Sequence, residues 1–160
     1  MNRNSRGFTL IEVAIYLVIA VFLMSMAINF FILAVNSRIQ KESVSGVEQE
    51  GQRALSVIIQ TVRNGFAIEK PIFGNATSTL IIRNATSSTD ITTFNLSGGQ
   101  IYITGSSTAA RPLTSNQPAV SNLLFSNITR EGTPGAARIE FTMTGRNYSK
   151  KFYGSAAIRQ

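Results

Sequence analysis

Glu12 is the only charged residue in a long apolar stretch near the start of the sequence. An ionised carboxylate at the centre of a membrane-spanning helix costs about 2.5–3.5 kcal/mol, and near the interface it still needs water or a partner. The chemistry open to such a group is ion pairing with a cation held in the same apolar surroundings. We therefore expect this carboxylate to have a functional role.

The segment 13–37 carries no charge and predicts a membrane-spanning helix. It would extend about 37 Å, which exceeds the roughly 30 Å of bilayer hydrocarbon. A secretory signal would have a shorter apolar core and a small-residue cleavage site after it, and no clear site of that kind follows here. Arg3 and Arg6 precede the segment and favour an N-terminus in the cytoplasm. Arg38 and Lys41 on the other side weaken that bias.

Composition excludes several classes of function. The 160 residues have a net charge of +7 and include no cysteine and no histidine. Disulfide scaffolds, thiolate or imidazole metal sites, and Ser-His-Asp or Cys-His catalysis are therefore excluded. The carboxylates are scattered, with no spacing that pairs two of them for acid-base chemistry. We expect no enzyme, no cofactor and no metal, and one small head after the apolar segment.

The helical pattern continues beyond the apolar segment and becomes amphipathic, which is typical of a helix packed on one side. The apolar stripe comprises Val44, Val47, Gly51, Leu55, Ile58, Val62 and Phe66. Gly46 and Gly51 lower helix propensity and would allow a bend. Asn64 and Gly65 predict a C-terminal cap, and Pro71 prevents continuation.

After Pro71 the sequence is rich in Thr, Ser, Asn and Gly with short apolar alternations, which is typical of strands and turns. We expect strands at 79–83, 91–96, 100–104, 120–127, 137–144 and 148–154. Gly98 and Gly99 predict a hairpin turn. A coiled-coil seam or a helix on a membrane surface would show a similar stripe, but the β-rich sequence favours packing on a sheet. The predicted fold class is α+β, a long N-terminal helix packed on an antiparallel β-sheet head.

Residues 7–13, Gly-Phe-Thr-Leu-Ile-Glu-Val, resemble the class III signal of type IV pilins and type II secretion pseudopilins. In that family a short basic leader ends in glycine, phenylalanine follows, and glutamate is fifth in the mature chain. The resemblance implies cleavage between Gly7 and Phe8 by prepilin peptidase, with N-methylation of Phe8. It also implies a pilin-like fold and assembly with other pilins or pseudopilins on a platform protein.

Cleavage would create an ammonium group at Phe8, four residues before Glu12. In a helical array the carboxylate of one subunit could meet the amine of its neighbour. Two unit charges about 4 Å apart attract by about 4 kcal/mol at an effective dielectric constant near 20, which offsets much of the cost of holding Glu12 in apolar surroundings. The alternative is that Glu12 reaches the lipid headgroups as the flank of an ordinary membrane anchor.

The resemblance extends more loosely into the head. Residues 94–102, 112–115 and 120–125 resemble, in this order, the head of J-type minor pseudopilins and related minor pilins. Asn29 stands where many type IVa pilins have proline, and no cysteines are available for the disulfide loop of many major pilins. Both departures favour a minor subunit. The implied domains are a leader (1–7), a transmembrane and assembly helix (8–37), an amphipathic helix half (38–66) and a β-rich head (67–160).

The favoured function is a minor pilin or pseudopilin subunit. It would cross the cytoplasmic membrane once with the head outside, and then join a type IV pilus or type II secretion-like filament at the cell surface or in the periplasm. The runner-up is a protein permanently anchored in membrane lipid, whose basic head binds DNA, polysaccharide or a secreted substrate.

Two further patterns in the head admit plainer explanations. A basic-aromatic patch for nucleic acid would comprise Arg146, Lys150, Lys151, Phe152 and Tyr153, although a solvated strand end explains the same residues. Asparagines that begin Asn-x-Ser/Thr triplets are Asn75, Asn84, Asn95, Asn127 and Asn147. A sequence this rich in Ser, Thr and Asn produces such triplets by chance.

Overall fold

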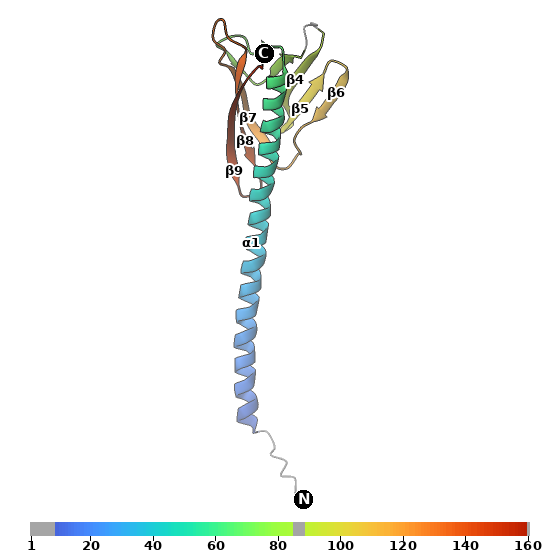
Figure 1. The fold of residues 1–160 in the computed structure, drawn as a ribbon. Coiled ribbons are helices and arrows are strands. Elements are labelled where there is room, and N and C mark those ends of the chain that lie inside the picture. The colour runs from blue at the N-terminus through green and yellow to red at the C-terminus, as the bar shows by residue number, and fades with distance from the viewer. Residues whose placement is uncertain (1–8, 85–88, 160) are drawn as a thin grey trace, which may run out of the picture. The chain divides into compact units, whose positions relative to one another are not determined.

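The computed structural model describes residues 9–84 and 89–159 (Figure 1). One helix, α1 (Leu10–Asn64), and nine strands lie in these ranges. The strands are β1 (Ala67–Lys70), β2 (Ala76–Thr77), β3 (Leu80–Arg83), β4 (Ile91–Ser97), β5 (Gln100–Gly105), β6 (Thr108–Pro112), β7 (Ala119–Asn127), β8 (Ala136–Thr144) and β9 (Ser149–Ala157). The chain divides into two compact units, Met1–Lys41 and Glu42–Gln160, and α1 contributes to both.

The fold class is α+β with a pilin-like architecture, as predicted: a long apolar N-terminal helix and antiparallel sheets. The strands form two sheets rather than the single sheet expected. One has the order β1-β3-β4-β5-β6 and the other the order β2-β7-β8-β9, and every pairing is antiparallel. The split was missed because alternation along a strand does not tell which strand will pair with it.

All six predicted strands are present, with bounds that agree to within one residue except at the end of β9, which extends to Ala157. Three short strands were missed, namely β1, β2 and β6. β6 is exposed at every position and lies at the edge of its sheet, so it has no buried face to produce an alternating pattern. The predicted hairpin at Gly98 and Gly99 is confirmed, because both have positive φ, 56° and 76°, and Ser97 pairs with Gln100.

The core of the Glu42–Gln160 unit lies between the last part of α1 and both sheets (Figure 1). The helix contributes Val47, Ala54, Leu55, Ile58 and Val62. The five-stranded sheet contributes Leu80, Ile82, Phe94 and Ile101, and the four-stranded sheet contributes Val120, Leu123, Phe125, Ile139, Phe141, Met143, Phe152 and Ala156. Fully burying one such large side chain is worth about 1.5–3 kcal/mol, so this shared cluster holds the helix to the sheets.

The absence of a side chain at Gly51 lets α1 approach β9. A Cβ built there would lie 2.2 Å from the ring of Phe152, which is 3% exposed and stacks on Phe141 at a centroid distance of 5.3 Å. Gly46, one and a half turns earlier, has nothing within 4 Å of a built Cβ. The helix runs through both glycines without interruption.

The helix ends at Asn64, as predicted, but the role expected of Gly65 was wrong. Gly65 does not adopt a positive φ and so is not a left-handed cap. Instead, a Cβ there would lie 2.4 Å from Cγ2 of Ile82, so the glycine makes room for β3. Because the helix has already ended, Phe66 falls outside the predicted stripe and is 53% exposed, against the expectation of burial.

Candidate functional site

The predicted cleavage site lies just ahead of the described structure. Gly7 and Phe8 are outside the described residues. The carbonyl oxygen of Thr9 accepts backbone hydrogen bonds from Glu12 and Val13, at 3.1 and 3.3 Å, and so opens the first turn of α1. The apolar helix therefore starts at Leu10, three residues after Gly7, where the leader is expected to end.

Glu12 lies in this first turn and is partly exposed. A negative charge there is favoured by the helix dipole. Tyr16, one turn later, donates a hydrogen bond from its hydroxyl to Glu12 Oε1 at 3.4 Å. None of the ion pairs within residues 9–84 and 89–159 includes Glu12. Any cation that pairs with this carboxylate therefore comes from outside the described part of its own chain.

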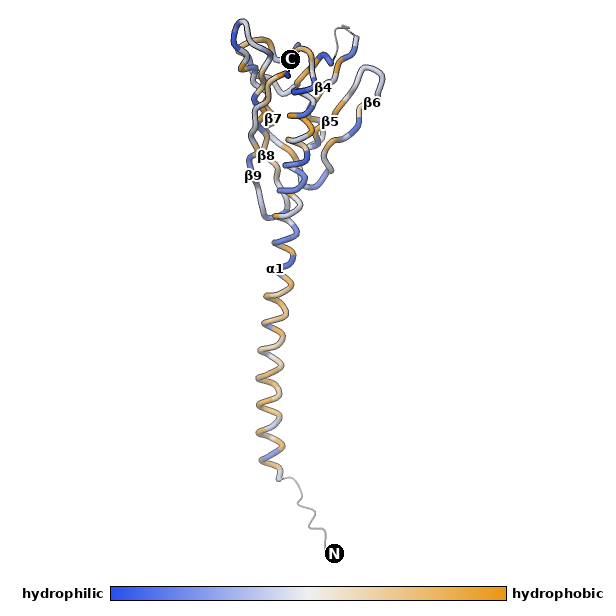
Figure 2. The backbone as a smooth tube through the Cα atoms, viewed as in Figure 1, coloured by the Kyte–Doolittle hydropathy of each residue, from blue (hydrophilic) through white to orange (hydrophobic). Residues whose placement is uncertain are grey.

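The helix surface around Glu12 is apolar. Every large apolar side chain from Leu10 to Val35 is exposed, from 39% at Val35 to 91% at Leu10. Figure 2 shows this part of α1 as almost continuously hydrophobic, whereas the later turns alternate. By length and composition the helix can cross a membrane. An exposed apolar surface of this extent requires lipid or other proteins to cover it.

Two polar side chains inside this segment bond to their own helix. Asn29 Nδ2 donates to the carbonyl oxygen of Ser25 at 2.8 Å. Ser37 Oγ donates to the carbonyl oxygen of Leu33 at 2.9 Å. Such bonds to the preceding turn lower the cost of placing polar groups in hydrocarbon. The sequence alone did not indicate the Asn29 bond.

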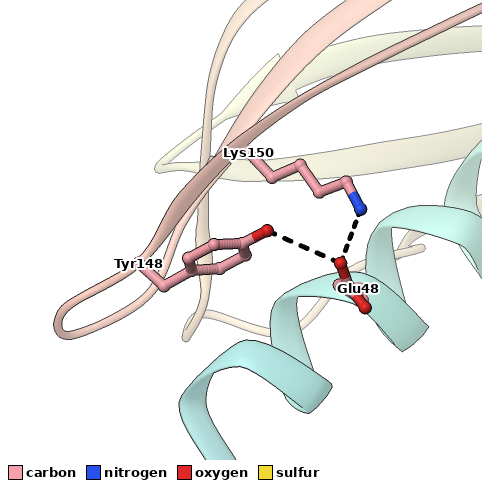
Figure 3. A network of polar contacts seen from close by, with 3 residues as sticks. All are labelled: Glu48, Tyr148 and Lys150. Carbon is pink, nitrogen blue, oxygen red and sulfur yellow. Dashed lines mark hydrogen bonds and ion pairs between the residues drawn. The ribbon is translucent and has the colours of Figure 1, made fainter. Parts of the chain in front are cut away.

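A polar network links the helix to the β8–β9 hairpin (Figure 3). Glu48 Oε1 accepts a hydrogen bond from Lys150 Nζ at 2.6 Å and one from the Tyr148 hydroxyl at 3.5 Å. The hydrogen bond from Lys150, together with the ammonium charge, holds the pKa of Glu48 below its usual value. The same hydrogen bond raises the pKa of Lys150. The sequence did not indicate this network, because Glu48 and Lys150 are far apart in the chain.

A second carboxylate of α1 holds a loop of the head. Glu50 Oε1 accepts a hydrogen bond from the backbone N–H of Ser115, and Glu50 Oε2 accepts one from Ser115 Oγ at 2.8 Å. Glu48 and Glu50 therefore attach α1 to both sides of the head, one to the β8–β9 hairpin and the other to the loop that follows β6.

The residues weighed as a nucleic-acid patch do not form one surface. Phe152 is buried in the core, whereas Tyr153, next to it on β9, is 76% exposed. Lys150 pairs with Glu48 of the helix, and Lys151 pairs with Glu140 of β8, each at 2.6 Å. Because side chains alternate along β9, Lys150 and Phe152 lie on one face of the strand, whereas Lys151 and Tyr153 lie on the other. The contiguous basic-aromatic surface that the sequence suggested is therefore absent.

Two of the asparagines that begin Asn-x-Ser/Thr triplets are held by hydrogen bonds within the head. Asn127 is buried; its Nδ2 donates to the carbonyl oxygen of Pro71 at 2.8 Å, and its Oδ1 accepts from the backbone of Thr129 at 3.0 Å. Asn84 Nδ2 likewise bonds to Thr92 Oγ1 at 2.8 Å. Across residues 9–84 and 89–159 no three carboxylates gather into a group that could hold a metal ion.

Comparison with known families adds one finding. Residues 2–28 match the model of the prokaryotic N-terminal methylation motif. No curated protein and no solved structure was found to match the chain. The motif implies processing by prepilin peptidase and assembly with other pilins, and together with the apolar helix it fits membrane anchoring. The chain thus combines a prokaryotic N-terminal methylation motif with a pilin-like α+β fold of one long apolar helix and antiparallel sheets.

Proposed function

We propose that this chain is a minor pilin or pseudopilin that assembles through α1 into a type IV pilus or a type II secretion-like filament. The observation that carries the proposal is the continuity between the motif at residues 2–28 and a helix whose apolar side chains stay exposed through Val35. Prepilin peptidase cuts between Gly7 and Phe8, the Phe8 amine is methylated, and the helix stays attached to the head.

Glu12 guides assembly in this proposal. The Tyr16 hydroxyl bonds to Oε1, and Oε2 makes no hydrogen bond within the described residues. That oxygen is open to the Phe8 ammonium of a neighbouring subunit. In apolar surroundings the pair is worth more than it is in water, so the carboxylate favours the position in the array where a neighbour's amine meets it.

The same proposal covers topology and subunit type. Before assembly the chain spans the cytoplasmic membrane once, with its N-terminus inside and its head outside. Asn29 in place of proline and the lack of cysteine favour a minor subunit, of which the J-type is the one that the head resembles. The assembly platform and the other filament subunits are its partners. The domain bounds 1–7, 8–37, 38–66 and 67–160 belong to this proposal.

Replacing Glu12 tests the assembly mechanism. Glu12→Val removes the partner charge and lowers the cost of insertion, so the variant should enter the membrane normally. The amount of the variant found in filaments sheared from the cells, divided by the amount found in the membrane, should fall about tenfold or more. Each 1.4 kcal/mol of lost interaction changes an equilibrium tenfold. Glu12→Gln, which keeps the size but not the charge, should fail similarly. Normal incorporation of both variants would show that the charge is dispensable.

A further inference from the structure

Asn29 places a carboxamide deep in the apolar segment of α1. It lies about 6 Å along the helix axis from Ser25, the midpoint of the uncharged stretch 13–37, and therefore well inside a hydrocarbon layer about 30 Å thick. One amide hydrogen is satisfied by the Ser25 carbonyl at 2.8 Å. Its Oδ1 and its second amide hydrogen make no hydrogen bond within residues 9–84 and 89–159.

The unused donor and acceptor need a partner once the helix is in a membrane. Lipid chains offer no hydrogen bond, and water is scarce at this depth, so an unsatisfied amide there is costly. Asparagine in a membrane helix meets this need by bonding across to a second helix. A carboxamide has both a donor and an acceptor, so two identical copies can satisfy each other with a pair of N–H···O bonds.

Three of the polar residues of the segment define a face on which such a contact can form, whereas Ser37 lies about 80° from Asn29 around the helix. At 100° per residue, Ser25, Asn29 and Asn36 fall within about 40° of one another around the helix. Glu12 lies about 100° from Asn29. We call the Ser25, Asn29 and Asn36 side of α1 the asparagine face. It is distinct from the position of the carboxylate proposed to guide assembly.

We propose that Asn29 pairs with Asn29 of a second copy of this chain inside the bilayer. The contact forms between membrane-resident chains before they enter a filament. It goes beyond the proposed function but rests on one part of it, the insertion of α1 into the membrane. The partner helix belongs to a second copy of this chain, because the asparagine carboxamide is complementary to itself.

The sequence contains no cysteine, so a single introduced cysteine is the only thiol in the chain. Any disulfide-linked dimer then reports contact at that one position. Asn36→Cys places the thiol on the asparagine face, two turns from Asn29. Ala34→Cys, at a similar depth, places it about 160° away from position 36. The full chain is reconstituted in phosphatidylcholine vesicles without other pilins or a platform protein, and is oxidised with copper phenanthroline. Asn36→Cys should yield several-fold more disulfide-linked dimer than Ala34→Cys.

Adding Asn29→Leu to the Asn36→Cys chain should lower its dimer yield to that of Ala34→Cys, whereas Asn29→Gln should retain part of it. Resistance to carbonate extraction would show that Asn29→Leu is still inserted. Unchanged cross-linking after Asn29→Leu, or equal yields from the two thiol positions, would overturn the proposal. Glu12→Val in the Asn36→Cys chain should leave the dimer yield unchanged, so failure of the assembly mechanism and failure of the asparagine contact give different results.

Discussion

At the scale of single residues, two glycines of α1 have opposite surroundings. Gly51 faces the ring of Phe152, whereas Gly46 faces open space. The sequence placed both in one amphipathic helix and attributed the same propensity cost to each. Only the packing of β9 against the helix distinguishes them, because the buried ring of Phe152 occupies the space that a side chain at Gly51 would need.

Gly51→Ala should therefore destabilise the head. Overpacking of a filled core costs about 1–3 kcal/mol, and the helix-propensity gain of about 1 kcal/mol offsets only part of it. Gly46→Ala gains the propensity without a clash and should raise stability by up to about 1 kcal/mol. Urea unfolding of the full chain in detergent, followed by near-ultraviolet circular dichroism, measures both. Equal effects of the two substitutions would contradict the packing assigned to Gly51.

The Glu48–Lys150 pair predicts a pH dependence of stability. The pKa of Glu48 is lowered in the folded state, so its contribution is present above the unfolded-state pKa and is lost as the pH falls through the lowered value. The pKa of Lys150 is raised, so its contribution is present below the unfolded-state pKa and is lost as the pH rises through the raised value. Glu48→Gln should lower the melting temperature at pH 7.

The deficit of Glu48→Gln relative to the unmodified chain should shrink as the pH is lowered through the acid range, where the native carboxyl is also neutral. Glu42→Gln is the matched control, because Glu42 is an exposed carboxylate of the same helix that takes part in none of the ion pairs described. It should show no such convergence. A Glu48→Gln deficit that stays constant from pH 7 to acid pH would mean that the pair does not stabilise the fold.

At the scale of elements, β7 contains an irregularity that fixes which side chains face the core. The register with β8 shifts between Ser121 and Leu124, and Asn122 there has a φ of 52°. The extra residue lets both Val120 and Leu123 point inward, at 3% and 4% exposure. Asparagine tolerates this left-handed conformation better than most residues.

Substitutions at Asn122 test the bulge. Asn122→Val places a β-branched residue in the left-handed region and should cost about 1–2 kcal/mol of stability. Asn122→Gly, which adopts positive φ freely, should be neutral to within a few tenths of a kcal/mol. Chemical denaturation of the full chain in detergent gives both values. A neutral Asn122→Val would show that β7 passes through this point without the bulge.

The elements that the sequence predicted are those with strong internal patterns. β8 alternates Ala137, Ile139, Phe141 and Met143, all fully buried, with polar residues on the other face, and the helix showed a three- and four-residue stripe. β6 and the bulge at Asn122 lack such a pattern and were missed. Glu12 could be identified because a lone charge stands out in an apolar run, whereas the Glu48–Lys150 pair depends on tertiary contact.

At the scale of the whole molecule, the two units use apolar residues in opposite ways. In Glu42–Gln160 they are shared between the last part of α1 and both sheets and are withdrawn from water. In Met1–Lys41 the large apolar side chains described are exposed. The first unit therefore depends on lipid or on other chains for its cover, while the second forms its own core. This division fits the proposal that the chain first inserts into a membrane and then assembles.

The central claim is that a leader ending at Gly7 is removed while the apolar helix is kept. Mass spectrometry of the protein purified from the membranes of a host with prepilin peptidase tests it directly, with a bulky substitution of Gly7 as the control that should accumulate uncut precursor. The account predicts an N-terminus at Phe8 bearing one added methyl group. An uncut N-terminus at Met1, or cleavage beyond residue 30 that removes the helix, would contradict it.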